Sequence, residues 1–267
     1  MSAKKPLLLV VAACSVAVWL VLNPVRSDQF KIYSQAMGET RRILVRLPER
    51  YGRSTASYPL LVLLDGGDQR QFFADRPLYS RSKKVLAALE KEGFPAMILV
   101  GVGNRDRIKD MTPVTRPDIY LGGGGSKAFM KFIEMELLPF VESRWRIGAV
   151  KILYGESYGG LFVLDAMVRG GQAFTDYIAV SPTVGVWPTG LAEAFRRRCQ
   201  RPFVVRSLFV IYGERDAPLV TEYTPPFIRE IESILPPRLR LQTDAIAGEG
   251  HTPASSLERG LRFIFGR

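Results

Sequence analysis

The residues from Gly155 to Gly159 have types and a spacing that suit nucleophilic chemistry. They read Gly-Glu-Ser-Tyr-Gly and fit the pattern G-x-S-x-G. The apolar run 152–154 before them predicts a strand and the run 161–164 after them predicts a helix, so Ser157 falls on a strand-to-helix turn. A capping serine in a glycine-rich turn is the structural alternative. The turn favours Ser157 as a nucleophile at a sheet edge, with glycines on both sides avoiding collisions.

An oxyanion formed by attack of Ser157 needs hydrogen-bond donors beside it. The start of the predicted helix offers the backbone amide of Tyr158, where the helix dipole also favours negative charge. A second amide is expected in the loop after an earlier predicted strand, in Leu-Leu-Asp-Gly-Gly-Asp at 63–68. Gly67 is the first candidate there and Gly66 the second, although both could serve only to turn the chain.

His251 is the only histidine of the chain and therefore the only imidazole that could act as a general base. It lies in Gly-Glu-Gly-His-Thr-Pro at 248–253, between the last predicted strand and the last predicted helix. A lone histidine is more often structural, but this one follows Ser157 in the chain order serine, acid, histidine. We expect its ring to lie within hydrogen-bond reach of the Ser157 hydroxyl.

The acid that would orient His251 has three candidates. Asp216 follows a predicted strand at 208–212 in the pattern G-x-x-D, which places it at the strand end. Glu214 is two residues away, and Glu249 is close to the histidine along the chain. Each of them could instead be a solvated loop carboxylate, and the pattern favours Asp216.

Short apolar runs alternate with segments of helical period, which predicts an α/β fold with a mainly parallel central sheet and helices on both faces. The expected strands are 42–47, 60–64, 97–102, 151–154, 177–180, 208–212 and 239–246. The expected helices are 81–92, 127–144, 158–168, 190–199, 222–235 and 254–265. We expect Ser126 to cap the helix at 127–144, Gly170 and Gly171 to end the helix at 158–168, and Thr252, followed by Pro253, to cap the last helix. The segment 103–125, rich in charge, proline and glycine, is expected to be a surface loop.

The composition limits the classes of function. The chain has 267 residues, enough for one catalytic domain at 28–267, and a formal net charge of +11. This charge would suit an anionic substrate, a membrane surface or nucleic acid, but no nucleic-acid module accompanies it, and we expect no nucleic-acid partner. The cluster Arg196 to Arg198 with Arg201 lies near an expected helix end. Cys199 has no expected partner and one histidine cannot build the usual metal sites, so neither a metal nor a cofactor is expected.

Residues 1–27 have the charge order of a targeting segment. Two lysines precede an apolar run from Leu7 to Leu22, which is short for a membrane-spanning helix. We expect a signal peptide or an N-terminal membrane anchor, with processing as a lipoprotein at Cys14 as a third alternative. The protein is accordingly expected to be exported, to the periplasm or the extracellular space, and to associate with a membrane if the segment is retained.

Several segments together resemble a known family, the putative esterase family of α/β-hydrolases, which includes S-formylglutathione hydrolases, feruloyl esterases, mycolyltransferases and siderophore trilactone esterases. The similar segments run from about Arg41 to the C-terminus and comprise residues 58–66, 101–113, 155–162, 177–182 and 248–251. The stretch Ser-Tyr-Gly-Gly-Leu-Phe-Val-Leu-Asp at 157–165 is most similar to the siderophore trilactone esterases. The chain departs from many relatives at Gly-Val-Trp, residues 185–187.

The resemblance implies an α/β-hydrolase fold and cleavage of carboxylic esters through an acyl-enzyme. Its family roles fall on Ser157 as nucleophile, His251 as general base and Asp216 as acid. The expected partner is a small-molecule ester, which could be anionic. Three alternatives are an esterase specific for siderophore trilactones, an acyltransferase, and a binding module on the same scaffold without catalytic activity.

Overall fold

A computed structural model of the chain describes residues 28–66, 78–116, 118, 122–171, 173–202 and 204–266. The expectations for residues 1–27 and for Gly67 lie outside these described residues. The strands are β1 (Asp28–Ser34), β2 (Glu39–Arg46), β3 (Tyr58–Leu64), β4 (Ile98–Val102), β5 (Ile147–Glu156), β6 (Asp176–Val180), β7 (Ser207–Gly213) and β8 (Arg240–Ile246). The α-helices are α2 (Leu78–Lys91), α3 (Arg107–Met111), α4 (Ser126–Phe132), α5 (Leu138–Glu142), α6 (Tyr158–Arg169), α7 (Pro188–Cys199), α8 (Pro218–Thr221), α9 (Thr224–Glu232) and α10 (Ser256–Phe265). A π-helical stretch at Ile133–Leu137 joins α4 to α5, and 3-10 turns occupy Tyr51–Arg53 and Val184–Val186.

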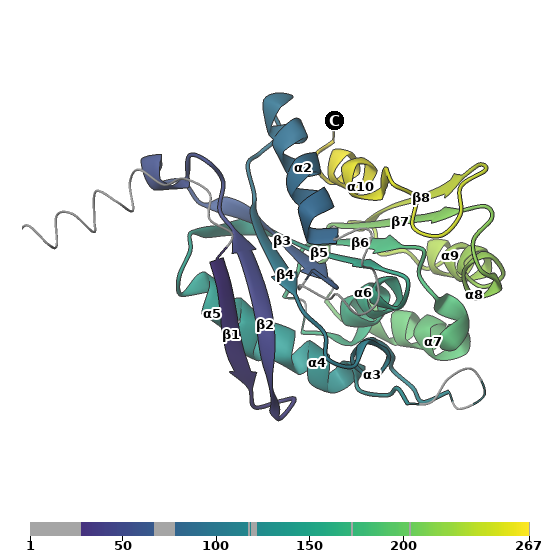
Figure 1. The fold of residues 1–267 in the computed structure, drawn as a ribbon. Helices are drawn as coiled ribbons and strands as arrows, with labels where there is room; N and C mark the ends of the chain where they lie inside the picture. The colour runs from purple at the N-terminus through teal and green to yellow at the C-terminus, as the bar shows by residue number, and fades with distance from the viewer. Residues whose placement is uncertain are drawn as a thin grey trace, which may run out of the picture.

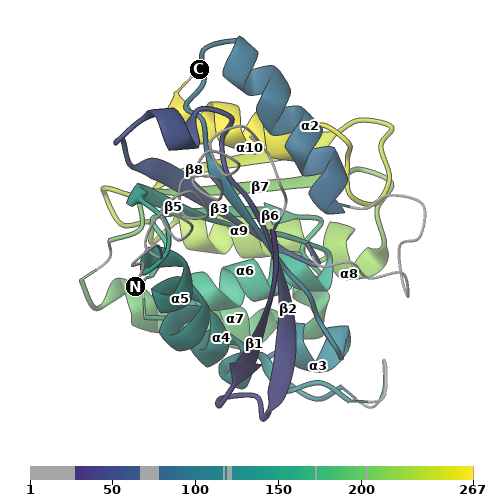
Figure 2. The same ribbon diagram turned by 60° about the vertical axis from the view of Figure 1, so that its left-hand side comes forward.

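The described strands form one eight-stranded sheet in the order β1-β2-β4-β3-β5-β6-β7-β8. The strands from β4 to β8 pair in parallel, whereas β1 and β2 pair antiparallel with each other and β2 pairs antiparallel with β4. Helices α2 and α10 cover one face, and α4, α5, α6, α7 and α9 cover the other (Figures 1 and 2). The expected α/β-hydrolase architecture, a mainly parallel sheet between two helical layers, is thereby confirmed.

Burial explains why these segments form these elements. Every apolar side chain from Leu60 to Leu64 is fully buried, as a strand covered on both faces requires. Helix α10 buries Leu257, Leu261 and Ile264 at the spacing of one helix face. The core is therefore divided by the sheet into two clusters, one under α2 and α10 and a larger one under α4 to α9.

The order of the strands creates a switch point at the centre of the sheet. From β3 the chain crosses to β4 on one side, and from there it crosses back to β5 on the other side of β3. In open parallel sheets the crevice outside the carboxyl ends of such neighbouring strands is where ligands bind. The loops after β3 and β5 flank this crevice, and Ser157 begins the second of them.

Several expected boundaries were wrong for local reasons. Strand β1 was not expected, because it is an exposed edge strand with a weak apolar pattern. The expected helix at 127–144 contains Pro139, whose missing amide cannot bond to the preceding turn, and the π-helical stretch precedes it. The expected helix at 222–235 begins at Thr224, followed by two prolines in its first turn.

Of the three expected helix caps, one is found in the structure and two are not. Gly170 does end α6. Ser126 is not a cap but lies inside α4, buried, with its hydroxyl bonded to Asp165 at 2.8 Å. The last helix begins at Ser256 rather than beside Thr252 and Pro253.

The segment 103–125 is not simply a surface loop, because its described part contains α3 and buried side chains. Asp110 is 1% exposed and forms a two-pronged ion pair with the buried Arg41, through oxygen–nitrogen distances of 2.5 and 2.9 Å. Burial raises the pKa of Asp110, and the hydrogen bonds and charge of Arg41 oppose that rise. Since removing one partner of such a buried pair costs roughly 3 to 5 kcal/mol, this contact anchors α3 to β2.

Candidate active site

Ser157 occupies a strained turn between β5 and α6. Its backbone has φ 61° and ψ −118°, a conformation that side-chain-bearing residues seldom adopt. Three backbone hydrogen bonds hold it there. The Ser157 amide donates to the Val180 carbonyl at 2.8 Å, and the amides of Leu161 and Thr183 donate to the Ser157 carbonyl at 3.0 and 3.4 Å. The turn is therefore fixed to β6 on one side and to the first turn of α6 on the other.

The glycines around Ser157 do not all have the same role. A Cβ on Gly155 would lie 2.3 Å from the Gly159 carbonyl oxygen, and a Cβ on Gly160 would lie 2.7 Å from the Val180 carbonyl oxygen. A Cβ on Gly159 would meet its neighbours only at 3.6 Å, an ordinary contact. The expectation of a steric requirement is therefore confirmed for Gly155 and wrong for Gly159, and Gly160 makes the close approach on the helix side.

Strained backbone is concentrated at the carboxyl edge of the sheet. Among the described residues, the non-glycine residues with positive φ are Asp65 after β3, Ser157 after β5, Ser181 after β6 and Thr252 in the loop after β8. Each such conformation costs about 1 to 3 kcal/mol and persists only where surrounding structure enforces it. Four of them at one edge mark it as the functional face of the fold.

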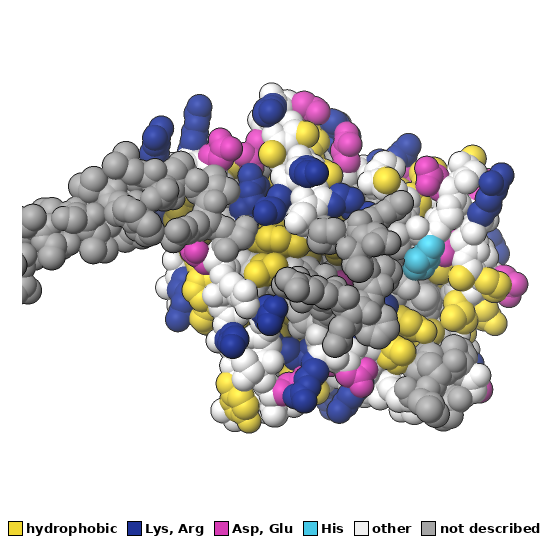
Figure 3. Space-filling view, viewed as in Figure 1, with side chains coloured by type: hydrophobic (Ala, Val, Ile, Leu, Met, Phe, Trp, Pro, Cys, Tyr) yellow, Lys and Arg dark blue, Asp and Glu magenta, His cyan; other side chains and the backbone are white. Residues whose placement is uncertain are grey.

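Asp216 and His251 are in direct contact. His251 Nδ1 lies 2.6 Å from Asp216 Oδ1, and that same oxygen accepts the Ala217 amide at 2.7 Å. The Asp216 side chain is fully buried, whereas the His251 side chain is 40% exposed. The imidazole, cyan in Figure 3, lies at the surface. Glu214 and Glu249, the other two carboxylates considered, are exposed.

The environment of Asp216 favours its ionised form. Burial raises the pKa of this carboxyl, but hydrogen bonds from His251, Ser181 and the Ala217 amide outweigh burial and hold the pKa below its ordinary value. An ionised carboxylate only accepts hydrogen bonds, so the Nδ1 atom of a neutral His251 ring carries the proton. The free lone pair is then on Nε2, which is the atom that could take a proton from a substrate or a hydroxyl.

The loops carrying Asp216 and His251 are packed directly on each other. A Cβ on Gly213, at the end of β7, would lie 2.2 Å from the Gly250 carbonyl oxygen, so only glycine allows the histidine loop to pass there. The Arg215 amide donates to the Glu249 carbonyl at 3.0 Å. These contacts bring the acid and the histidine together although they are 35 residues apart.

The segments that carry Ser157 and His251 bond to two adjacent residues at the end of β6, but Ser157 and His251 do not share a hydrogen bond in this structure. The Thr252 amide donates to Ser181 Oγ at 2.9 Å, and the Ser157 amide donates to Val180, the residue before Ser181. The expected contact between the Ser157 hydroxyl and the imidazole is therefore not formed here. Catalytic hydrogen bonds often tighten only when substrate is bound.

The region expected to supply an oxyanion hole is ordered by residues that the sequence patterns did not single out. Asp65 accepts hydrogen bonds from Asn104 Nδ2 at 2.6 Å and from Arg107 Nε at 2.8 Å. Arg107 Nη2 also donates to the Glu156 carbonyl at 2.9 Å, and its guanidinium group lies 5.5 Å from the centre of the Tyr158 ring. Arg107 thus joins the loop after β3 to the turn that holds Ser157.

Burial raises the pKa of Asp65, and the charge and hydrogen bond of Arg107 are the main effects that oppose it. Gly66 packs against β4, because a Cβ there would lie 2.6 Å from the Gly101 Cα atom. Tyr158 is the first residue of α6, as expected for an amide at a helix N-terminus. The roles of Tyr158 and Gly67 in binding an oxyanion stay predictions.

Ser181, Asp65 and Arg107 are the site residues that sequence reasoning missed. Arg107 and Ser181 lie within the segments that resemble the family, at 101–113 and 177–182, but their types alone predict no role. Within the described ranges, no group of three or more His, Cys, Asp or Glu side chains is placed to hold a metal ion. No helix of the described chain is both long enough and apolar enough to cross a lipid bilayer.

Comparison with known proteins places this site in a family. The family model described as "Putative esterase" matches residues 34–208, more than half of the chain. The chain belongs to the putative esterase family. The match includes Ser157 and ends before Asp216 and His251, so the placement of those two residues rests on the geometry given above.

Two curated relatives are named as esterases, one for apo-salmochelin and one for ferri-bacillibactin. The chain is 30% identical over 139 residues to the apo-salmochelin esterase of Escherichia coli, an alignment that covers 49% of this chain and 43% of that protein. It is 30% identical over 146 residues to the ferri-bacillibactin esterase of Bacillus subtilis, covering 48% of this chain and 49% of the relative. The chain thus aligns with about half the length of these curated relatives.

A solved structure agrees with the fold over most of the chain. The IroE-like serine hydrolase of Shewanella oneidensis superposes with a TM-score of 0.76 at 25% sequence identity, over 90% of this chain and 80% of that one. The likeness extends well beyond the segment matched by the family model. It therefore supports the α/β-hydrolase fold over most of the chain.

The different roles of the glycines beside Ser157 can be tested by two alanine substitutions. Gly155→Ala forces a side chain into the Gly159 backbone, and we expect it to lower the free energy of unfolding by about 3 kcal/mol or more. Gly159→Ala is the matched control, because alanine fits there and favours a helix by up to about 1 kcal/mol. Urea unfolding followed by circular dichroism measures both. Equal unfolding midpoints for the two variants would contradict this assignment.

Proposed function

We propose that the protein is a serine hydrolase that cleaves carboxylic esters. The observation that supports this most strongly is the pairing of a buried, ionised Asp216 with His251 at the sheet edge where Ser157 is held in a strained turn. Membership of the putative esterase family gives independent support. An ester is the substrate class that this combination of nucleophile, base and fold serves without a cofactor.

The proposed reaction has two steps. Nε2 of His251 takes the proton of the Ser157 hydroxyl as its oxygen attacks the ester carbonyl carbon, and Asp216 stabilises the imidazolium that forms. Backbone amides at Tyr158 and Gly67 hold the negative oxygen of the tetrahedral intermediate. His251 then gives this proton to the departing alcohol. In the second step His251 takes a proton from a water molecule, whose oxygen attacks the acyl-enzyme and releases the carboxylic acid product from Ser157.

Single substitutions in the three proposed catalytic residues should separate their roles. We expect Ser157→Ala and His251→Ala to lower kcat for a short p-nitrophenyl ester by at least about 10³-fold, because each removes a group that acts in the transition state. Asp216→Asn should lower kcat by about 10²- to 10⁴-fold with KM little changed.

Ser143→Ala, at an exposed serine outside the site, is the matched control for these variants and should be fully active. Circular dichroism should show each variant folded. Normal turnover by a folded Ser157→Ala or His251→Ala variant would refute the proposal.

The second candidate is an esterase specific for the lactone rings of siderophores. The observation that favours it is that the curated relatives described above are named for salmochelin and bacillibactin. The net charge of +11 would suit anionic catecholate substrates. An acyltransferase on the same fold and a catalytically silent binding module are the remaining alternatives.

The rates at which the protein hydrolyses different esters distinguish these candidates. A siderophore esterase should hydrolyse a catecholate trilactone with a kcat/KM at least about 10²-fold above that for simple aryl esters, because remote binding energy is then used in the transition state. Equal kcat/KM values for the trilactone and for simple aryl esters would indicate a general esterase. Transfer to an added alcohol that exceeds hydrolysis would indicate an acyltransferase, and no turnover of any ester would indicate a binding module.

We also propose that the protein is exported and that its N-terminal segment is either a signal peptide or a membrane anchor. The support is the sequence pattern of residues 1–27, two lysines followed by an apolar run. Cell fractionation with immunoblotting, together with the mass of the purified chain, separates the two forms. Recovery of full-length protein in the cytosol alone would contradict export.

A further inference from the structure

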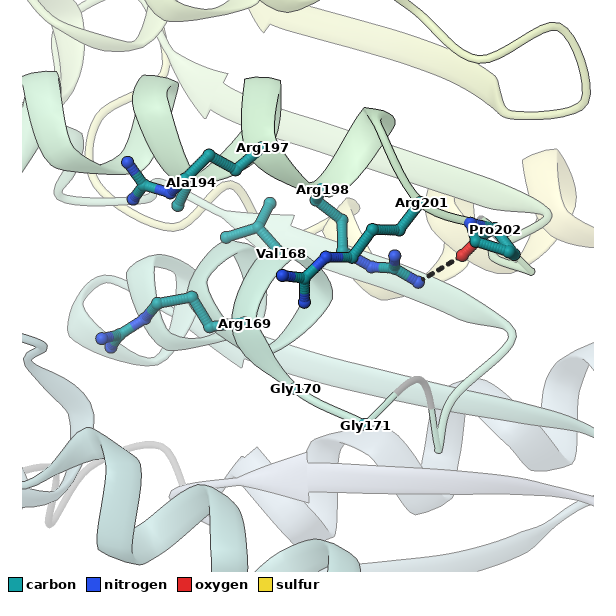
Figure 4. Close-up of a pocket in the computed structure, with 9 residues that line it drawn as sticks. All are labelled: Val168, Arg169, Gly170, Gly171, Ala194, Arg197, Arg198, Arg201 and Pro202. Atoms are coloured by element: carbon teal, nitrogen blue, oxygen red, sulfur yellow. Dashed lines mark hydrogen bonds between the residues drawn. The ribbon is translucent and has the colours of Figure 1, made fainter.

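A cavity lies at the opposite end of α6 from Ser157. It has a volume of about 560 Å³ and lies between the C-terminal ends of α6 and α7 (Figure 4). Its described lining consists of Val168, Arg169, Gly170, Gly171, Ala194, Arg197, Arg198, Arg201 and Pro202. Helix α6 has 12 residues and is therefore about 18 Å long, so this cavity is separate from the candidate active site.

The described lining contains four arginines and no acidic residue. Arg169 is the most fully paired, because it holds Asp165 through two hydrogen bonds and reaches Ser126 Oγ at 3.0 Å. Among the described residues, the one carboxylate paired with Arg197 is Glu193, at 3.4 Å and in an exposed setting where such pairs contribute little. Arg201 forms no ion pair with any carboxylate of the described residues. The cavity therefore keeps a positive excess after its ion pairs are taken into account.

Arg198 brings a second positive charge beside Arg201. Its side chain is buried, and its Nη2 atom donates to the Pro202 carbonyl at 2.7 Å. Burial and then the adjacent Arg201 charge lower the pKa of Arg198, so the two guanidinium groups repel each other in the absence of an anion. Figure 4 shows both side chains extending from the end of α7 over Gly170 and Gly171. A bound anion would relieve this repulsion.

Stabilisation of the helix dipole does not account for the whole cluster. Cations in the last turn of a helix are favourable, and Arg196, Arg197 and Arg198 lie in the last turn of α7. Arg196, however, points to Glu230 on α9 and does not line the cavity, whereas Arg201 lies beyond the end of the helix and does line it. The excess charge is therefore directed into the cavity and not distributed around the helix end.

Two further side chains lie near these arginines. The Tyr177 hydroxyl is buried with no hydrogen-bond partner among the described residues, and the charges of Arg198 and Glu134 both act on it. Glu134 accepts the Gly171 amide at 2.8 Å, and burial raises the pKa of Glu134 while that hydrogen bond opposes the rise. Glu134 is thus bonded to the backbone at Gly171 and forms no ion pair with Arg201 among the described residues.

We propose that this cavity is a binding site for a phosphate-bearing anion larger than a single phosphate, such as a diphosphate or the headgroup of an anionic lipid. Planar guanidinium groups match the oxygen pairs of a phosphate, and charge-assisted hydrogen bonds of this kind are the strong ones. The volume lies in the range of small-ligand sites and exceeds what one phosphate needs. Nothing in the proposed ester hydrolysis requires the site.

Direct binding measurements on the full chain test the proposal, with inorganic pyrophosphate as the soluble probe. Isothermal titration calorimetry should show one site in the wild type, with an affinity that falls as salt is added. The double variant R197Q/R201Q removes two exposed guanidinium groups and should weaken binding by at least about tenfold. The matched control R196Q changes a neighbouring arginine of the same helix and should bind as the wild type does.

A second arm identifies the source of the phosphate. Vesicles of phosphatidylcholine with and without phosphatidylglycerol are sedimented with wild-type, R197Q/R201Q and R196Q protein. A loss of sedimentation confined to R197Q/R201Q and to the vesicles with phosphatidylglycerol indicates a lipid headgroup. Pyrophosphate binding without that difference indicates a soluble ligand. Pyrophosphate and vesicle binding that R197Q/R201Q leaves unchanged, or no binding of either probe, would overturn the proposal.

Discussion

The hydrogen bond between Asp216 and His251 is the interaction on which the proposed chemistry depends. It requires the loops after β7 and after β8 to pack against each other. Gly213 allows this because, without a side chain, it lets the histidine loop pass directly against the end of β7. It also requires a buried carboxylate that stays ionised, and the hydrogen bonds from His251 and from the Ala217 amide favour that form. With the carboxylate ionised, the proton of a neutral imidazole is fixed on Nδ1 and Nε2 is left as a base.

The parallel sheet brings other residues of the site close to the Asp216–His251 contact. Because parallel strands end at one edge, residues that follow β3, β5, β6 and β8 meet there although they are far apart in the chain. Asp65, Ser157, Ser181 and Thr252 all adopt strained backbone at that edge. Arg107 and Ser181 connect neighbouring loops across it through hydrogen bonds. These hydrogen bonds and the buried strands beneath them hold the residues of the site in place.

The sequence predicted what depends on local pattern and missed what depends on tertiary contact. The apolar run before Ser157 and the glycines around it were enough to predict the turn, and the layered fold followed from alternating strands and helices. The choice of Asp216 over Glu214 and Glu249 was only a preference, because burial of a carboxylate cannot be read from spacing. Asn104 and Arg107, which fix Asp65, carried no pattern of their own. Edge strand β1 was missed because its weak alternation reflects partial exposure.

Covalent labelling with a fluorophosphonate tests the central claim most directly, because it reports the reactivity of one hydroxyl and needs no knowledge of the substrate. Mass spectrometry of the wild type should show a single adduct, on Ser157. The rate of labelling should fall by about 10²- to 10⁴-fold in folded His251→Ala, since the general base is then absent. Adduct formation on another residue, or labelling of Ser157 at the wild-type rate in that variant, would contradict the account.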